Sequence, residues 1–163
     1  MGCFKIIAKD KKRKARTGIL MTKSGPAETP FFMPVATKTA VKHVSVEDLA
    51  TMPAKVMISN AFILSLRPGT DIIKKFGGMK KFMNFNGINF TDSGGFQMYS
   101  PSLYLGSDKN GVNFIDPFAG QKLYITPEKD MQIQIDIDSD VAMCLDTMPL
   151  IEHSKEAIAL AVE

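Results

Sequence analysis

Short apolar runs alternate along this chain with segments whose apolar residues recur at helical spacing. Near the N-terminus, residues 4–8 and 17–21 flank a basic stretch and predict a β-hairpin, and Ser24-Gly25-Pro26 predicts the turn that follows it. We therefore divide the chain into an N-terminal hairpin region, residues 1–29, and a longer part, residues 30–163, in which strands and helices are expected to alternate.

The longer part is expected to contain four strand-then-helix units. The predicted strands are residues 31–36, 55–60, 87–92 and 140–146, the last of them apolar enough to predict burial on both faces. A second hairpin is predicted from residues 112–115 and 123–125, which alternate around Pro117-Phe118-Ala119-Gly120. This hairpin would be an insertion between the third strand and its helix.

Helix starts and stops are also marked in the sequence. Ser45 is placed to cap a short helix, and residues 70–76 predict a helix that stops at Gly77-Gly78. Thr126-Pro127-Glu128 combines a cap, a proline at the first position and an acid in the first turn. We expect that helix to turn Met131, Ile135 and Ile137 inward, and a final helix to contain Ile158, Leu160 and Val162.

Strands that alternate with helices predict an α/β protein with a parallel sheet, wound as an open sheet or as a barrel. In both architectures ligand-binding groups gather at the carboxyl ends of the strands. Asn60, Asp92 and Asp146 occupy three such ends. The chain has neither a GxGxxG motif nor a P-loop, which disfavours a dinucleotide-binding Rossmann domain.

Composition narrows the class of protein. A chain of 163 residues with 45% hydrophobic and 23% charged residues has enough apolar material for one globular domain. No stretch of about 18 apolar residues and no signal peptide is present, so we expect a cytoplasmic protein without a membrane span. The two cysteines, Cys3 and Cys144, cannot form a disulfide framework or a cysteine zinc site, and no metal site is expected in this chain.

Positive charge is concentrated in residues 9–16, which hold six lysines and arginines, although the net charge is only +3. Such a run can contact phosphates, but a solvated surface is the commoner explanation and is favoured here. His43 and His153 are isolated in the sequence and receive no functional role.

The most informative segment is residues 91–97, Thr-Asp-Ser-Gly-Gly-Phe-Gln, at the end of the third predicted strand. It places a carboxylate and a hydroxyl beside two glycines, which allow close approach of the backbone to a ligand, and beside an aromatic ring. These groups together indicate a site for a flat, polar heterocycle.

Several segments, in their order and spacing, resemble the tRNA-guanine transglycosylases, also called queuine or archaeosine tRNA-ribosyltransferases. They are residues 14–18, 29–35, 60–62, 66–69, 91–97, 126–129, 139–140 and 145–146. The resemblance extends from about Lys14 to Asp146. It implies a (β/α)8 TIM barrel with insertions, and a pentosyltransferase (EC 2.4.2 type) that exchanges guanine in tRNA for a 7-deazaguanine without breaking the backbone.

The resemblance also implies roles for single residues. Asp92 matches the family's proton acceptor and base contact, and Ser93, Gly94, Gly95 and Phe96 match the rest of its substrate-binding loop. Phe96 would stack on the base. Without the resemblance, Phe96 would be interpreted as an ordinary core aromatic.

Asp146 matches the aspartate that binds the Watson–Crick edge of the purine. The chemistry agrees, because guanine presents N1–H and an exocyclic amino group as neighbouring donors, and one carboxylate can accept both. A target base must also leave its stack before it can be exchanged, so stacking and edge recognition have to replace the contacts it loses. Without the resemblance, Asp146 would be interpreted as a turn residue after a strand.

The family's nucleophile, a second aspartate that attacks the ribose, belongs to the later half of the barrel and is not expected in this chain. The family's zinc site also lies there. We therefore expect residues 1–163 to supply about the first four of eight βα units, to pair with a complementary second-half chain or another copy of itself, and to be inactive alone. A non-catalytic base-binding or regulatory subunit, and a DNA-modifying relative, remain alternatives. The sequence leaves open which 7-deazaguanine is used and which tRNA position is modified.

Overall fold

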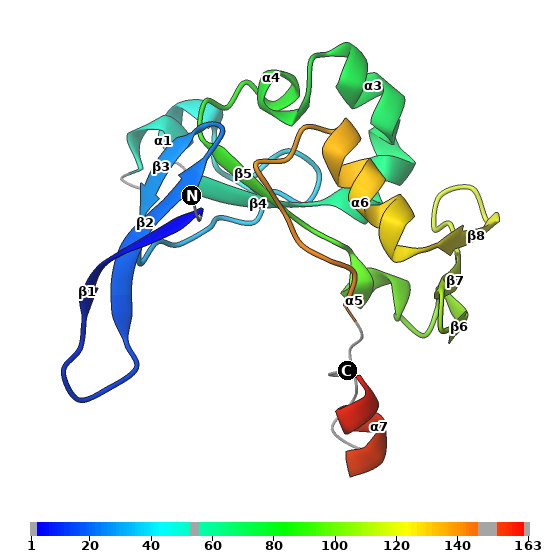
Figure 1. The fold of residues 1–163 in the computed structure, drawn as a ribbon. Coiled ribbons are helices and arrows are strands. Elements are labelled where there is room, and N and C mark those ends of the chain that lie inside the picture. The colour runs from blue at the N-terminus through cyan, green and yellow to red at the C-terminus, as the bar shows by residue number, and fades with distance from the viewer. Residues whose placement is uncertain (1–2, 53–55, 147–152, 162–163) are drawn as a thin grey trace.

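The computed structural model describes residues 3–52, 56–146 and 153–161. Within these residues it contains one three-stranded parallel sheet and two three-stranded antiparallel sheets, connected by short helices (Figure 1). The protein is thus of the mixed α/β class, as the alternating pattern predicts. None of the helices in the described part is long and apolar enough to cross a membrane.

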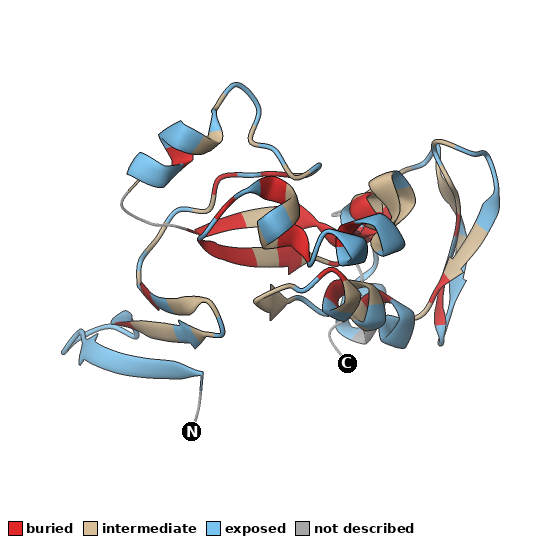
Figure 2. Cartoon of the chain, turned by 90° about the horizontal axis from the view of Figure 1, so that it is seen from above, coloured by how far each residue is buried: buried red, intermediate tan, exposed pale blue. Residues whose placement is uncertain are grey.

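The N-terminal sheet consists of β1 (Phe4–Lys9), β2 (Arg16–Thr22) and β3 (Gly25–Glu28) in antiparallel order. The predicted hairpin is confirmed, and Figures 1 and 2 show it as an exposed arm that extends away from the buried part of the molecule. The predicted turn at Ser24-Gly25-Pro26 is wrong for two of its residues, because Gly25 and Pro26 pair with β2. A proline is tolerated there because β3 is an edge strand that needs no donor on its outer side.

The central sheet is parallel, with β5 (Ile88–Asp92) between β4 (Val56–Asn60) and β9 (Val141–Ala142). Along β4 and β5 the register brings Asn60 beside Asp92. The prediction of a parallel sheet is therefore confirmed, with strands that end at the same edge.

Two predicted strands are much reduced. Residues 31–36 contribute only one parallel bridge, Val35 to Ile58, because Pro34 has no N–H to continue a ladder. Residues 140–146 form only the two-residue β9, and they are half-buried or exposed rather than buried on both faces. The apolar character of this segment was therefore a poor indicator of burial.

Short helices follow the strands, and several of them pack against the central sheet. They are α1 (Val46–Thr51), α2 (Ala61–Leu64), the kinked segment η1 (Ser65–Gly69), α3 (Thr70–Lys75), α4 (Met79–Met83), α5 (Gly95–Met98), α6 (Pro127–Asp136) and α7 (Lys155–Leu160). The predicted starts at Ser45 and Thr126 are confirmed, since each side chain accepts a hydrogen bond from the backbone three residues on. Helices α2, α4 and α5 have at most five residues, too few to produce a periodic pattern. Of the predicted final helix, Val162 lies outside the described residues.

Helix α6 is rotated from its predicted orientation. Ile137 is fully buried as expected, but Met131 is only half-buried and Ile135 is 63% exposed. The buried positions within the helix are polar, Asp130 and Gln134, and with Ile137 they follow the spacing of one helical face. The helix therefore turns two polar side chains toward the sheet.

The insertion forms a three-stranded antiparallel sheet of β6 (Tyr104–Asp108), β7 (Gly111–Ile115) and β8 (Lys122–Ile125), not a two-stranded hairpin. The predicted pairing of the last two is confirmed. Phe114 of β7 packs edge-on against Phe62 of α2, with ring centroids 4.6 Å apart. This contact fixes the insertion to the carboxyl end of the central sheet.

The buried residues concentrate on the central sheet and the helices against it (Figure 2). One cluster joins Met57 of β4 to Ile73 of α3 and Met79 of α4, and another joins β3 to the first residues of β4 and β5. The N-terminal sheet thus packs at the amino ends of the parallel strands.

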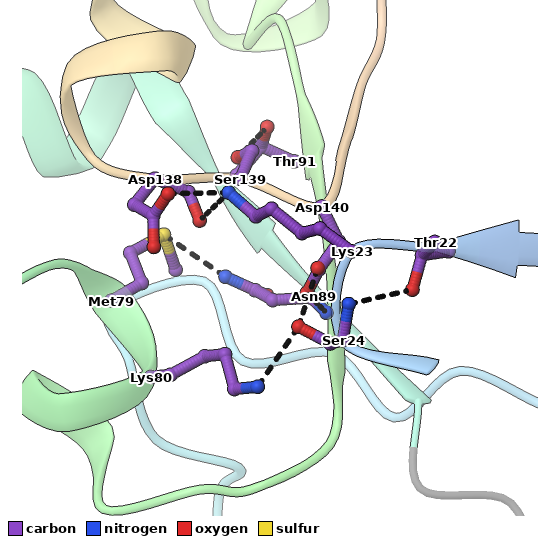
Figure 3. A network of polar contacts seen from close by, with 10 residues as sticks. All are labelled: Thr22, Lys23, Ser24, Met79, Lys80, Asn89, Thr91, Asp138, Ser139 and Asp140. Atoms are coloured by element: carbon purple, nitrogen blue, oxygen red, sulfur yellow. Dashed lines mark hydrogen bonds and ion pairs between the residues drawn. The ribbon is translucent and has the colours of Figure 1, made fainter. Parts of the chain in front are cut away.

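A polar network connects the same parts (Figure 3). Ser24 donates a hydrogen bond to Asp140 (2.5 Å) and accepts one from Lys80 (2.8 Å), while the backbone N–H of Asn89 donates to Asp140 (2.9 Å). Lys23 forms an ion pair with Asp138. The network holds the segment that leaves α6 against the start of β5.

Candidate functional site

The predicted loop after β5 forms a tight turn whose shape depends on Gly94. The carboxylate of Asp92 accepts a hydrogen bond from the N–H of Gly94 (3.1 Å), and Gly94 has a φ of +75°. A Cβ on Gly94 would lie 2.2 Å from the Cβ of Phe62. Both the backbone conformation and the space therefore require glycine, and α5 begins immediately after it.

Asn60, at the end of β4, stabilises this loop through hydrogen bonds of its side chain. Its side-chain amide donates to Gln97 (2.8 Å), and its oxygen accepts from the N–H of Ile63 (2.7 Å), capping α2. Asn60 is only 2% exposed. Asn60, one of the three predicted strand-end residues, is thus buried and supports the loop, and it is not exposed to a ligand.

Ser93 and Gly95 bring Asp146 to the loop. The hydroxyl of Ser93 donates to the carboxylate of Asp146 (3.2 Å) and accepts from the N–H of Gly95 (3.3 Å). A Cβ on Gly95 would lie 2.6 Å from that same carboxylate oxygen. Asp146 follows β9 by four residues and is exposed, so these contacts, and not a strand, place it beside the loop.

Phe96 is 69% exposed. Its interpretation as a core aromatic is therefore wrong, and its exposed ring belongs to α5, four residues after Asp92. The structure thus brings Asp146 to the loop of Asp92, Ser93, Gly94 and Gly95, and Phe96 follows that loop at the start of α5.

Burial changes the acidity of two carboxyl groups here. The pKa of Asp92 is raised, chiefly because burial disfavours the charged form, with a further increase from the charge of Asp146 and an opposing effect of the Gly94 N–H. Asp130, on α6, has its pKa raised to about 7, again chiefly by burial and further by Asp92 and Asp146, while a hydrogen bond from Gln134 opposes the rise. Asp130 is thus the buried member of a group of three carboxylates.

Sequence reasoning missed Asp130 and Gln134. Gln134 is fully buried, and its Nε2 donates to Asp130 (2.7 Å). The spacing of these residues with Ile137 is helical, but a search for apolar faces passes over polar residues at such positions. The sequence signal for Asp130 would have been its position on the same helical face as Ile137, a predicted core residue.

An open pocket of about 550 Å³ adjoins the site. Among its lining residues are Tyr99, Tyr104, Leu145, Asp146 and Ala157, whereas Asp92 and Phe96 do not line it. Asp146 therefore lies between the loop after β5 and this pocket.

No metal site was predicted for this chain. Within residues 3–52, 56–146 and 153–161, no group of three histidine, cysteine or acidic side chains is arranged to hold a metal ion. Cys3 and Cys144 are both exposed free thiols.

The arrangement suits a flat heterocycle with hydrogen-bond donors on one edge. The exposed carboxylate of Asp146 can accept two neighbouring N–H groups, and the exposed ring of Phe96 offers a stacking surface. The raised pKa of Asp92 makes its carboxylate a stronger base than an ordinary aspartate.

Comparisons with known proteins agree with this chemistry. A family model described as Queuine tRNA-ribosyltransferase matches residues 10–163. The chain is 44% identical over 153 residues to proteins named Queuine tRNA-ribosyltransferase from Macrococcus caseolyticus and from Staphylococcus aureus. Each match covers 94% of this chain and 40% of the relative, so the chain spans less than half the length of these proteins.

Proposed function

Because the chain belongs to the queuine tRNA-ribosyltransferase family, we propose that it supplies the base-recognition part of an enzyme that exchanges guanine in tRNA for a 7-deazaguanine. The observation that carries the proposal is the contact of Asp146 with Ser93 and Gly95, next to Asp92. One exposed carboxylate and one half-buried carboxylate are thereby held at one end of a parallel sheet.

Asp146 recognises the Watson–Crick edge of the base. Its carboxylate accepts the N1–H and the exocyclic amino group of guanine or a 7-deazaguanine, while Ser93 orients it. An asparagine at this position could accept only one of these donors well. The ring of Phe96 stacks on the base and replaces the neighbours that the base had in the tRNA.

Asp92 accepts a proton during the exchange. Its raised pKa increases its basicity, and the Gly94 N–H holds the carboxylate in place. Gly94 and Gly95 allow the loop to lie close to the base, as glycines do where a backbone contacts a ligand.

The architecture that we propose is the first four βα units of a TIM barrel, formed by residues 30–163 and preceded by the hairpin region, residues 1–29. Three parallel strands, with the site at their carboxyl ends and the hairpin sheet at their amino ends, support this proposal. The second aspartate, which attacks the ribose, and the zinc site belong to the later half of such a barrel. A complementary chain or segment would supply them, a second copy of this chain could only cover the open sheet edge, and tRNA in the cytoplasm is the substrate.

Guanine titration of the protein that carries these residues tests base recognition. We expect Asp146→Ala to weaken guanine binding by about 100-fold, because two charge-assisted hydrogen bonds are lost. Glu47→Ala, on α1, removes an exposed acidic side chain away from the loop and serves as the matched control. Guanine binding that is equal in Asp146→Ala and the parent would refute the proposed role of Asp146.

Exchange is tested separately, with labelled guanine and guanine-containing tRNA. We expect residues 1–163 alone to bind guanine without incorporating it, since our assignment places the nucleophile outside them. Incorporation by this chain alone would show that the nucleophile lies within these residues. Binding of guanine by the protein with no exchange under any condition would favour a regulatory subunit.

A further inference from the structure

The side chain of Gln134 connects β5, which ends at Asp92, to the segment after β9, which leads to Asp146. Its Nε2 donates to the carbonyl oxygen of Met143 (2.7 Å) and its Oε1 accepts from the Met143 N–H (3.1 Å). Pairing with both backbone groups of one residue is what a neighbouring strand would provide. Gln134 does this one residue after β9 ends.

The same amide contacts β5. The hydroxyl of Thr91 donates to Gln134 Oε1 (2.6 Å), and Thr91 also lies 2.5 Å from the hydroxyl of Ser139. A hydroxyl has one proton, so the hydroxyl of Thr91 must accept from that of Ser139. Thr91 immediately precedes Asp92, and Met143 precedes Asp146 by three residues. Gln134 is thus bonded to a residue close in sequence to each aspartate.

Asp130 fixes the orientation of this amide. Gln134 Nε2 faces two acceptors, the carboxylate of Asp130 (2.7 Å) and the Met143 carbonyl, while Oε1 faces two donors. The reverse orientation would oppose donor to donor and acceptor to acceptor. Gln134 and Asp130 are 0% and 1% exposed, so water cannot replace a lost partner without opening the core.

We propose that Gln134, oriented by Asp130, is a positioning residue that sets the spacing of Asp146 from Asp92, and so determines whether one base can contact both carboxylates. This inference rests on the proposed function. Asp146 is beyond the end of β9, and its distance from β5 depends on how the backbone at Met143 is held. Thr91 is bonded to that backbone as well, since its carbonyl oxygen accepts from the Met143 N–H (3.1 Å).

Four variants of the protein test this proposal through guanine affinity and through amide hydrogen exchange at Met143. Gln134→Leu keeps the size of the side chain and removes its hydrogen bonds, and Asp130→Leu removes the acceptor that orients the amide. Asp130→Asn retains an acceptor for Gln134 and is the conservative rescue. Ile73→Ala shortens a fully buried apolar side chain of α3, which cannot hydrogen-bond to these residues, and it controls for lost stability.

We expect Gln134→Leu to weaken guanine binding by about tenfold or more, because displacement of a binding group by a fraction of an ångström has effects of this size. The same variant should accelerate hydrogen exchange of the Met143 amide. Asp130→Leu should behave in the same direction, whereas Asp130→Asn and Ile73→Ala should bind guanine as the parent does. If Asp130→Asn bound guanine as weakly as Asp130→Leu, the proposal would be overturned, because hydrogen bonding would then not be the reason for the effect.

The two readouts separate failure of this inference from failure of the proposed function. Unchanged exchange at Met143 in Gln134→Leu would refute the inference whether or not guanine binds. Faster exchange together with unchanged guanine affinity would refute it as well. A parent protein that does not bind guanine at all would refute the proposed function, and with it the positioning role.

Discussion

Gly94 and Gly95 are adjacent in the loop after β5, but the structure requires glycine at the two positions for different reasons. Gly94 has a positive φ and lies against the Cβ of Phe62, part of the packed interior. Gly95 has an ordinary φ, and the nearest group to its missing Cβ is the carboxylate of Asp146, the end of an exposed side chain. The first glycine therefore serves the fold, and the second keeps space for a functional group.

Alanine substitutions should separate these two requirements. Gly94→Ala should lower the free energy of unfolding by about 2 kcal/mol or more, because strain at positive φ adds to the clash with Phe62. Gly95→Ala should have a smaller effect on stability and should instead weaken guanine binding, because it displaces Asp146. Urea denaturation and guanine titration of both variants measure the two effects, and equal effects on both quantities would contradict the distinction.

Asp130 should make stability depend on pH. Its pKa rises from 3.8 to about 7 on folding, so between these values the folded state binds more protons than the unfolded state. Stability should therefore fall as the pH rises through this window, by no more than about 1.4 kcal/mol per pH unit for one proton. Asp92, whose pKa is also raised, acts in the same direction.

Urea denaturation at several pH values, from about 5 to about 8, measures this slope. Carboxyl groups with lowered pKa, such as Asp108 and Asp136, are ionised in both states over this range and add no slope. Asp130→Asn cannot ionise, so its stability should decline less than that of the parent. A slope that is the same in both proteins would show that Asp130 does not titrate in the folded state as described.

At the scale of single elements, α6 matters most, because it carries both Asp130 and Gln134 on its buried face. Its start is fixed by Thr126, whose hydroxyl accepts from the N–H of Lys129 (3.2 Å). A short helix gains much of its stability from its cap and its packing rather than from intrinsic propensity. The position of the two polar residues therefore depends on this cap.

Two cap substitutions allow a matched comparison. Thr126→Ala and Ser45→Ala should each cost about 1 kcal/mol of stability, since each removes a side chain that accepts from the first turn. Only Thr126→Ala should also weaken guanine binding, because α1 carries no residue of the proposed site. Thermal denaturation and guanine titration of both variants give the comparison, and equal loss of binding would point to a general effect of stability.

Over the whole molecule, the central sheet has an exposed apolar border. Beyond β4 the described residues add only the bridge at Val35, which is 61% exposed, and Phe32, three residues earlier, is 79% exposed. Apolar side chains beside an incompletely paired strand are a typical place for another strand or another copy to add. In the proposed barrel, further strands would cover this border.

We therefore expect residues 1–163, expressed alone, to associate as their concentration rises. Replacing Phe32 and Val35 by glutamate should reduce the association, because like charges on an edge oppose pairing. Glutamate in place of the exposed Ile135, which is on α6 rather than at the sheet border, is the control. Sedimentation that shows a monomer of the unsubstituted chain over a wide range of concentration would contradict the expectation.

Local signals were the most reliable part of the sequence analysis. The caps at Ser45 and Thr126 were predicted correctly because a cap is formed by neighbouring residues. Residues 91–97 could be proposed as a site loop for the same reason, since they are contiguous. Predictions that depended on distant contacts failed more often, as with the strand expected at residues 140–146 and the inward orientation of Ile135.

The sequence by itself determined the α/β class, the hairpins, the helix starts, the loop at Asp92 and the family, because each of these is encoded in the order of nearby residues or in motifs. Only the tertiary structure decided that Asp146 contacts that loop through Ser93 and Gly95, and that Asp130 and Gln134 are buried behind it. The physical reason is that these contacts join distant residues: Thr91 and Gln134 are 43 positions apart, Ser93 and Asp146 are 53 apart, and no local pattern records such contacts.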